Sequence, residues 1–450
     1  MPLTGIDIYK LLPKTNCKEC KFPTCLAFAM KLAQKQAELS ACPYVSDDAK
    51  QALDAAARPP IRLVTVGAGP KAFQVGNEIV LFRHEKTFYH PPALVIRVKD
   101  SDPADSVAAK VKEAAAYSVE RVGHKMGLGG IAIQNKSGDK AAFVRTVQQV
   151  QSLTDLPLVL MATDPGAMEA ALEKSAAQKP LLHAATKDNW QPMAALAKKH
   201  QCPLAVQDAG GLQGLSDLSD QVAGAGIEDI VLDPGAKDFG SSLVPLTQIR
   251  RLALKNNFRP LGYPVISFPG EGATSAEEEA VLAAQHIAKY ASIVVLDTFA
   301  PEMAYPLLTL RMNIYTDPQK PIQVTPGVYP FSNPKASSPL LVTTNFSLTY
   351  FSIAGEVESC GFPSWLLVTD TEGLSVLTAW AAGKFDAARI AKTVKDFKVT
   401  ENVGHQSLIL PGAVAVLRGE LEETLSGWKI LVGPRDAVDI GSYLKRTWTA

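Results

Sequence analysis

Residues 157–185, PLVLMATDPGAMEAALEKSAAQKPLLHAA, decide the fold of this 450-residue chain. Two apolar runs, at 157–162 and 180–185, enclose a segment with small apolar residues and charges at helical spacing. This pattern predicts two β-strands joined by a helix. Because both strands are continuously apolar rather than alternating, we expect both of their faces to be covered, as in a parallel sheet.

The same pattern extends in both directions along the chain. Successive strands start 23 to 36 residues apart, which is the length of one strand–helix unit. Eight units in succession predict an α/β fold of the (β/α)8 TIM-barrel type. Upstream, residues 61–67 and 78–82 flank Gly76-Asn77 and predict a hairpin able to plug or cover one end of the barrel. The eight predicted strands are 94–98, 130–134, 157–162, 180–185, 203–208, 229–233, 264–268 and 292–297.

Barrel enzymes carry their active sites at the carboxyl ends of the strands. Here those ends carry Asp208, Asp233 and Asp297, among other polar residues. Aspartate at a strand end also caps the following helix or forms a tight turn, and this role fits the pattern better. No metal triad or acid–base pair can be named, so the sequence predicts no catalytic residue in the barrel.

Composition excludes two function classes. The chain has 45 Lys+Arg and 45 Asp+Glu, so no basic field exists to hold a nucleic acid. Apolar stretches fall short of the ~20 residues that cross a bilayer, which argues against a membrane protein. The N-terminus has no basic segment followed by an apolar core, so we expect no secretory signal and a cytoplasmic location.

Four of the six cysteines lie within the first 42 residues. Cys17, Cys20, Cys25 and Cys42 form the pattern C-x2-C-x4-C-x16-C-P, in which three thiolates share one loop and a fourth closes a tetrahedral set. Structural zinc usually uses two C-x2-C pairs, so this spacing favours a [4Fe–4S] cluster over zinc. Helices are predicted at 26–39 and 47–57. A head of about 58 residues is too small to be stable without its metal.

A second α/β pattern follows a proline-rich segment at 318–334. Four predicted parallel strands with crossing helices make a small Rossmann-like or flavodoxin-like sheet. The predicted domains are therefore 1–58, 59–318 and 319–450. The tail strands are 340–344, 365–369, 407–410 and 428–432, and its helices are 347–358, 373–382, 386–396, 412–424 and 436–446.

Open sheets of this kind bind ligands beyond the carboxyl ends of their strands. Those ends are rich here in hydroxyl residues and glycine, which let hydroxyls and backbone N–H groups approach a large ligand with polar edges. Helix capping remains an equally good explanation for any single residue. The candidate cofactor-binding residues are Thr343, Thr344, Asn345, Asp370, Thr371, Glu372, Gly373, Leu374, Pro411, Gly412 and Gly433.

The opening MPLTGIDIYKLLPKTNCKECKFPTC, with Cys42-Pro43-Tyr44, a barrel and an α/β tail, resembles the large (gamma) subunit of the corrinoid iron–sulfur protein of the reductive acetyl-CoA (Wood–Ljungdahl) pathway. The resemblance implies a [4Fe–4S] cluster on the four head cysteines. It also implies a cobamide, a corrinoid of the vitamin B12 type, held by the tail. One departure is that Lys18-Glu19 and Lys21-Phe22 stand around Cys20, where glycine is expected in many relatives.

The resemblance implies a methyl carrier. Cobalt(I) accepts the methyl group of methyltetrahydrofolate through a methyltransferase and passes it, as methyl-cobalt(III), to CO dehydrogenase/acetyl-CoA synthase. The cluster serves reductive reactivation by a low-potential electron donor or reductive activator, and a small subunit completes a heterodimer. Whether such a carrier counts as an enzyme of the methyltransferase class stays open, because cobalt rather than a side chain is the nucleophile.

No histidine of the chain lies in the Asp-x-His-x-x-Gly motif by which many cobamide domains ligate cobalt. A base-off cobamide without a histidine ligand is therefore expected, which makes cobalt(I) easier to reach. His405 is the only histidine of the tail, and it precedes a strand rather than following one. The proline-rich segment at 318–334 is interpreted as a semi-rigid tether that lets the tail move between partners.

Two alternatives remain. An iron–sulfur oxidoreductase would bind a small substrate at the barrel mouth and need no cobalt. A zinc-headed scaffold would only assemble partners, and iron analysis would distinguish it from the other two.

Overall fold

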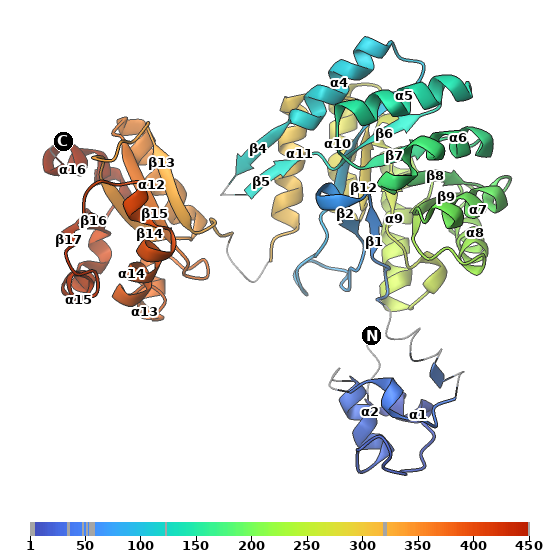
Figure 1. The fold of residues 1–450 in the computed structure, drawn as a ribbon, viewed down its shortest axis with the longest axis horizontal. Helices are drawn as coiled ribbons and strands as arrows, with labels where there is room; N and C mark the ends of the chain where they lie inside the picture. The colour runs from blue at the N-terminus through green and yellow to red at the C-terminus, as the bar shows by residue number, and fades with distance from the viewer. Residues whose placement is uncertain are drawn as a thin grey trace. The chain divides into compact units, whose positions relative to one another are not determined.

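The computed structural model describes residues 5–33, 37–46, 49–50, 53, 59–121, 124–317 and 322–448. Contacts divide the chain into two compact units, Met1–Tyr117 with Gly127–Tyr315 and Ser118–Met126 with Thr316–Ala450. Figure 1 shows the ribbon of each part. No helix among the described residues is long and apolar enough to cross a membrane.

Eight parallel strands form the predicted barrel. Their order in the sheet is β10-β9-β8-β7-β6-β3-β12-β11. A parallel bridge between Leu232 and Val265 joins the two ends of this sheet, so that the barrel is nearly closed. The strands are β3 (Ala93–Lys99), β6 (Gly130–Gln134), β7 (Leu158–Met161), β8 (Leu181–Ala185), β9 (Leu204–Gln207), β10 (Ile230–Asp233), β11 (Ile266–Ser267) and β12 (Ile293–Leu296).

Helices follow the strands around the outside of the barrel (Figure 1). The carboxylates of Asp139 and Asp164 accept hydrogen bonds from the first N–H groups of α5 and α6, so capping explains why these helices begin where they do. The helices are α4 (Ala104–Ala116), α5 (Lys140–Leu153), α6 (Pro165–Ser175), α7 (Trp190–His200), α8 (Leu212–Gly224), α9 (Phe239–Lys255), α10 (Ala276–Ala288) and α11 (Pro301–Ile314).

A hairpin covers the amino end of the barrel, as predicted, but its second strand was placed wrongly. β1 (Val64–Val66) pairs with β2 (Phe73–Val75), and their valines belong to the core inside the barrel. Residues 78–82 are not a strand. The buried carboxylate of Glu78 instead accepts hydrogen bonds from the backbone N–H groups of Tyr89 and His90, which holds this segment in an irregular course.

A second hairpin was missed by the sequence analysis. β4 (Ser118–Arg121) and β5 (His124–Gly127) interrupt the barrel between α4 and β6. α4 ends at Ala116, two residues before this hairpin begins. Residues 118–126 of this hairpin group with the tail unit. Burial raises the pKa of the Tyr329 and Tyr350 phenols, and the negative charge of Glu120 contributes to both increases.

The tail is a five-stranded sheet of order β13-β15-β14-β16-β17. The four predicted strands are present and parallel: β14 (Leu340–Thr344), β15 (Ser364–Thr369), β16 (Ser407–Leu410) and β17 (Lys429–Val432). The fifth, β13 (Gly327–Phe331), lies inside the predicted tether and pairs antiparallel with β15. The tether interpretation is therefore wrong for these residues, and residues 318–321 lie outside the described part of the chain.

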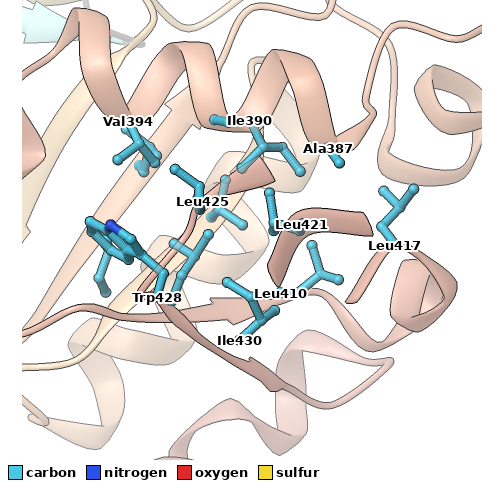
Figure 2. Packing of buried hydrophobic residues seen from close by; sticks show 14 of the residues in the cluster. Ala387, Ile390, Val394, Leu410, Leu417, Leu421, Leu425, Trp428 and Ile430 are labelled. Atoms are coloured by element: carbon cyan, nitrogen blue, oxygen red, sulfur yellow. The ribbon is translucent and has the colours of Figure 1, made fainter. Parts of the chain in front are cut away.

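Helices cover the tail sheet, and one of its faces carries the larger core. Figure 2 shows Ile390 and Val394 of α14 packed toward Leu421 and Leu425, with Trp428 and Ile430 completing the cluster. Residues 412–417 form short 3-10 turns with a kink at Val414, whose backbone is not helical, rather than the start of a regular α-helix. The helices are α12 (Ser347–Cys360), α13 (Val376–Ala381), α14 (Ala387–Asp396), α15 (Arg418–Thr424) and α16 (Ile440–Thr447).

The head contains α1 (Gly5–Leu11), α2 (Cys25–Ala33) and a 3-10 turn at Leu39–Ala41. The predicted helix at 26–39 is thus present over its first half, and residues 34–36 are outside the described part. The predicted helix at 47–57 also falls mostly on residues that the structure does not describe. Ile8, Leu12, Phe28 and Val45 form a small apolar cluster with three of the cysteines.

Candidate functional site

The head brings its cysteines into two environments. Cys20, Cys25 and Cys42 are buried in the same apolar cluster, whereas Cys17 is exposed. The Asn16 side chain accepts a hydrogen bond of 2.8 Å from the Cys25 N–H, and the Asn16 N–H points to the Cys25 sulfur at 3.4 Å. These bonds fix the loop that carries Cys17 against the start of α2.

Four cysteine thiolates are the usual ligands of an iron–sulfur cluster, so the residue types present suit one. That the four surround a single metal site is a prediction. Among the described residues, no three Cys, His, Asp or Glu side chains are grouped closely enough to hold a metal ion. The hydrogen bond of 2.7 Å that Tyr44 donates to Glu19 is the main cause of the raised pKa of the Tyr44 phenol, and Cys17 and Cys42 make the smallest contributions to it.

The tail has a cleft of about 420 Å³ that is lined by residues of the paired strands β14 and β16, of α12, and of the segment that follows β17. In the sheet order β14 and β16 are the strands at which the chain reverses its direction of winding, the usual ligand position in open α/β sheets. Two leucines at its rim, Leu348 and Leu377, are 66% and 55% exposed. Arg435 and Asp436 also line the cleft, so it suits part of a large apolar ring system with polar groups at its edge.

Three hydroxyls at the carboxyl ends of β14 and β15 are fully buried. Among the described residues, Thr343, Thr344 and Thr369 have no hydrogen-bond partner for these groups. A buried hydroxyl without a partner costs about 1–3 kcal/mol, so such a group is rarely retained without a reason. A ligand with polar atoms at this end of the sheet would supply the missing partners.

Asn345 organises the loop that follows β15. Its side-chain oxygen accepts hydrogen bonds from the N–H groups of Thr371 and Gly373, at 2.9 and 3.0 Å, and from the Thr371 hydroxyl. Its side-chain nitrogen donates to the carboxylate of Asp370 at 3.1 Å. The loop is therefore shaped in advance by the protein itself, with Glu372 and Gly373 in left-handed conformations, at φ of +56° and +75°.

The predicted cofactor-binding residues thus fall into separate groups. Pro411 and Gly433 line the cleft, whereas Asn345, Asp370, Thr371, Glu372, Gly373 and Leu374 belong to the loop network. Gly412 serves packing, because a Cβ there would lie 2.5 Å from the Gly433 carbonyl oxygen. Arg435 was missed, although it stands only two residues beyond Gly433 at the end of β17.

His405 is engaged within the protein. Its Nε2 lies 2.8 Å from the carbonyl oxygen of Ser338, and its Nδ1 accepts a hydrogen bond of 3.2 Å from the Ser407 N–H. Trp448 packs against the same ring at 4.8 Å. Both ring nitrogens are occupied, so His405 has no free nitrogen for a metal.

The barrel mouth carries a charged network. The guanidinium of Arg97, 4% exposed, donates two hydrogen bonds to Asp297, at 2.5 and 2.7 Å, and one to Glu271 at 2.8 Å. Asp233 lies 2.8 Å from His183 and accepts a hydrogen bond from the Gly235 N–H. These groups satisfy one another, and Asp208 likewise pairs with Lys187.

Comparison with known proteins gives full-length matches. A family model described as CO dehydrogenase/acetyl-CoA synthase delta subunit matches residues 63–444, and a second whose description names an Fe-S cluster matches residues 12–44. The chain is 49% identical over 445 residues to the corrinoid/iron-sulfur protein large subunit of Moorella thermoacetica, with 99% of each chain covered.

An archaeal relative aligns over the same length. The chain is 37% identical over 456 residues to the acetyl-CoA decarbonylase/synthase complex subunit gamma of Methanothermobacter thermautotrophicus, again with 99% of each chain covered. Among solved structures, dihydropteroate synthase from Thermus thermophilus aligns with 57% of this chain and 100% of its own, at 18% identity and a TM-score of 0.40.

Proposed function

The chain belongs to the family of corrinoid/iron–sulfur protein large (gamma) subunits, and on that premise we propose that it is the methyl carrier of the reductive acetyl-CoA pathway. In this role it accepts a methyl group that a methyltransferase delivers from methyltetrahydrofolate, and it gives that group to CO dehydrogenase/acetyl-CoA synthase. The heterodimer with a small subunit, the electron donor or reductive activator, and the cytoplasmic location are parts of the same proposal.

We assign the two cofactors to the head and the tail. Cys17, Cys20, Cys25 and Cys42 would hold a [4Fe–4S] cluster, and the cleft beside β14 and β16 with the Asn345 loop would hold a cobamide. When bound, the cobamide supplies the cobalt that takes up and releases the methyl group, and the cluster supplies electrons for its reactivation. The three-domain division at 58 and 318 fits this assignment.

The chain's own residues then have positioning roles. The buried hydroxyls of Thr343, Thr344 and Thr369 would bond polar groups of the ligand, and Leu348 and Leu377 would cover its apolar ring. The Asn345 network holds the β15 loop in one conformation, which reduces the entropy lost on binding. His405 is bonded elsewhere, which supports a cobamide without a histidine ligand from the tail.

The observation that carries the proposal is the cleft at the reversal point of the tail sheet. Three buried hydroxyls without a partner among the described residues lie at the ends of β14 and β15 but do not line this cleft, and they are a second, separate indication. The test is metal content with an anaerobic visible spectrum on native protein. We expect four irons and about one cobalt per chain, with a cobalt(I) band that disappears when a methyl donor is added. Four irons and no uptake of added cobamide would favour an oxidoreductase, and zinc alone would overturn the cluster.

A further inference from the structure

The loop at residues 13–24 carries three exposed lysines, Lys14, Lys18 and Lys21, together with the exposed thiol of Cys17. Lys14, Lys18 and Lys21 all adopt left-handed backbone conformations, with φ of +58°, +65° and +66°. A hydrogen bond of 2.9 Å from the Lys21 N–H to the Lys18 carbonyl oxygen closes the turn between two of them. The three lysines therefore belong to one short, tightly turned loop.

Lysine is a costly residue at such positions. Glycine adopts a positive φ freely, whereas another residue there costs on the order of 1 kcal/mol or more. Three such residues in one loop indicate that the side chains are kept for a reason other than folding. None of them is buried. Lys14 places its Nζ 5.7 Å from the centre of the Tyr9 ring, a contact within the head that Lys18 and Lys21 are not seen to make among the described residues.

The charge of the loop is positive. Between residues 13 and 24, three lysines face one acidic residue, Glu19, which gives a net charge of +2. Glu19 accepts the hydrogen bond from Tyr44, so its carboxylate is directed to that phenol. Cys17, the only exposed thiol of the four, lies directly beside Lys18. An oxidised [4Fe–4S] cluster on four thiolates adds a charge of about −2, so the positive charge that an approaching protein would meet is carried by the exposed lysine side chains and not by the loop as a whole.

We propose that Lys14, Lys18 and Lys21 form the docking surface for an acidic electron-transfer protein. This inference rests on the proposed function, because it requires a cluster on the four cysteines. One electron passes from the reduced donor to the oxidised cluster, so the donor loses one electron and the cluster gains one. Opposite charges steer such encounters and raise their rate, and the effect declines as salt screens it.

Lysines beside a thiolate cluster could instead act only on the cluster's own potential, and the experiment separates these roles. Iron-loaded full-length protein is mixed with a reduced acidic ferredoxin, and the rate of cluster reduction is followed by absorbance at rising ionic strength. The variants are Lys18→Gln/Lys21→Gln and Lys18→Glu/Lys21→Glu. The matched control is Lys31→Gln, an exposed lysine in the last turn of α2. The cluster potential is titrated for each protein.

We expect the charge reversal to slow reduction by about tenfold or more at low salt, with the difference vanishing at high salt. The potential and the control should stay unchanged. A rate that follows a shifted potential without salt dependence would overturn the docking role, and so would an unchanged rate. Protein that binds no iron would refute the proposed function itself, which is a different result.

A glycine variant separates backbone strain from charge. Lys18→Gly/Lys21→Gly removes the charges and relieves the left-handed strain, whereas the glutamine pair removes the charges alone. Docking predicts that both pairs lose the salt-dependent acceleration equally. Acceleration retained by the glutamine pair but not by the glycine pair would assign the effect to loop shape and overturn the proposal.

Discussion

Thr344 and Thr369 are cross-strand partners at the carboxyl ends of β14 and β15, and both are fully buried. Their hydroxyls find no partner among the described residues. Valine has nearly the same shape without the hydroxyl. We therefore expect Thr344→Val and Thr369→Val to raise the free energy of unfolding without cobamide by about 1 kcal/mol each, because an unsatisfied polar group disappears. Denaturant titration measures this change.

The same substitutions should weaken cobamide binding, since the ligand would lose hydrogen-bond partners. Thr371→Val is the matched control. Its hydroxyl donates to Asn345 at 2.9 Å or to the Leu374 carbonyl at 3.1 Å, so valine there should lower stability instead. If Thr344→Val and Thr369→Val bind cobamide as tightly as the parent protein, the hydroxyls do not contact the ligand.

His286 in α10 makes stability depend on pH. Its ring is fully buried, neither nitrogen has a partner among the described residues, and burial lowers its pKa to about 4. Between its ordinary pKa near 6.5 and about 4, the unfolded chain binds a proton that the folded chain does not. The free energy of unfolding therefore contains the full contribution of the neutral His286 ring above pH 6.5. It decreases as the pH falls from 6.5 to about 4, by up to roughly 3 kcal/mol.

Replacing the ring by an apolar side chain tests this assignment. His286→Leu should flatten the dependence of unfolding free energy on pH between 7 and 5, as measured by urea titration at each pH. His84→Gln, at an exposed position, should leave the dependence as it is. An equal slope in the parent protein and His286→Leu would place the acid sensitivity elsewhere.

At the scale of elements, an ion pair connects two neighbouring barrel strands. It joins Arg97, near the carboxyl end of β3, to Asp297, which directly follows β12. Burial alone would raise the pKa of Asp297, but hydrogen bonds and positive charge from Arg97 hold it below its ordinary value. Asp297→Asn leaves a buried guanidinium without its main counter-charge, so we expect a loss of about 3 kcal/mol in unfolding free energy. Cobamide content should not change, because these residues lie in the barrel unit.

A surface ion pair provides the control for this loss. Lys199 and Glu169 lie 3.1 Å apart on α7 and α6 with side chains 61% and 48% exposed. Glu169→Gln should therefore cost less than about 1 kcal/mol. Equal effects of the two substitutions in chemical denaturation would show that the Arg97 network contributes no more than a surface pair.

The sequence predicted the barrel strands and the four parallel tail strands because they are short, mainly apolar runs, and most of them are buried on both faces. The edge strand β17 is the exception, because Lys429 is exposed and only Ile430 is fully buried. The sequence could not predict β13, because Pro330 interrupts that pattern. An edge strand tolerates proline, since one row of its N–H groups faces away from the sheet. The strand predicted at 78–82 does not form, although its sequence is mainly apolar. The buried carboxylate of Glu78 accepts hydrogen bonds from the backbone N–H groups of Tyr89 and His90, and these bonds hold the segment in an irregular conformation.

The candidate site was predictable only in part. Strand-end positions located Asn345 and the 370–374 loop, because topology dictates where strands end. The sequence does not show which side chains bond one another, so the central role of Asn345 and the orphan hydroxyls required the structure. The cysteine pattern names four thiols, and their placement around one metal stays a prediction.

At the scale of the whole molecule, β13 changes where the tail unit begins. Residues 322–331 bond within that unit: the Val324 N–H donates to the Asn345 carbonyl oxygen, and β13 pairs along β15. Tyr329 and Phe331 also pack against Tyr350 of α12, at ring distances of 5.3 and 6.3 Å. Residues 322–331 are therefore part of the folded tail and do not serve as a flexible connection.

Two tail fragments test this boundary. A fragment of residues 319–450 keeps β13, and we expect it to unfold cooperatively and to bind cobamide. A fragment of residues 335–450 exposes the edge of β15 and removes Phe331 from the core, so it should lose at least about 2 kcal/mol, or some 8 °C or more in Tm, and tend to aggregate. Thermal melts by circular dichroism and absorbance titration with cobamide measure both properties.

If the two fragments had the same Tm and bound cobamide equally well, β13 would not be needed for the fold of the tail, and residues 318–334 would again be interpreted as a tether. If 319–450 also fails to fold, the hairpin at 118–126 is required, because it is the other part of the chain that groups with the tail unit.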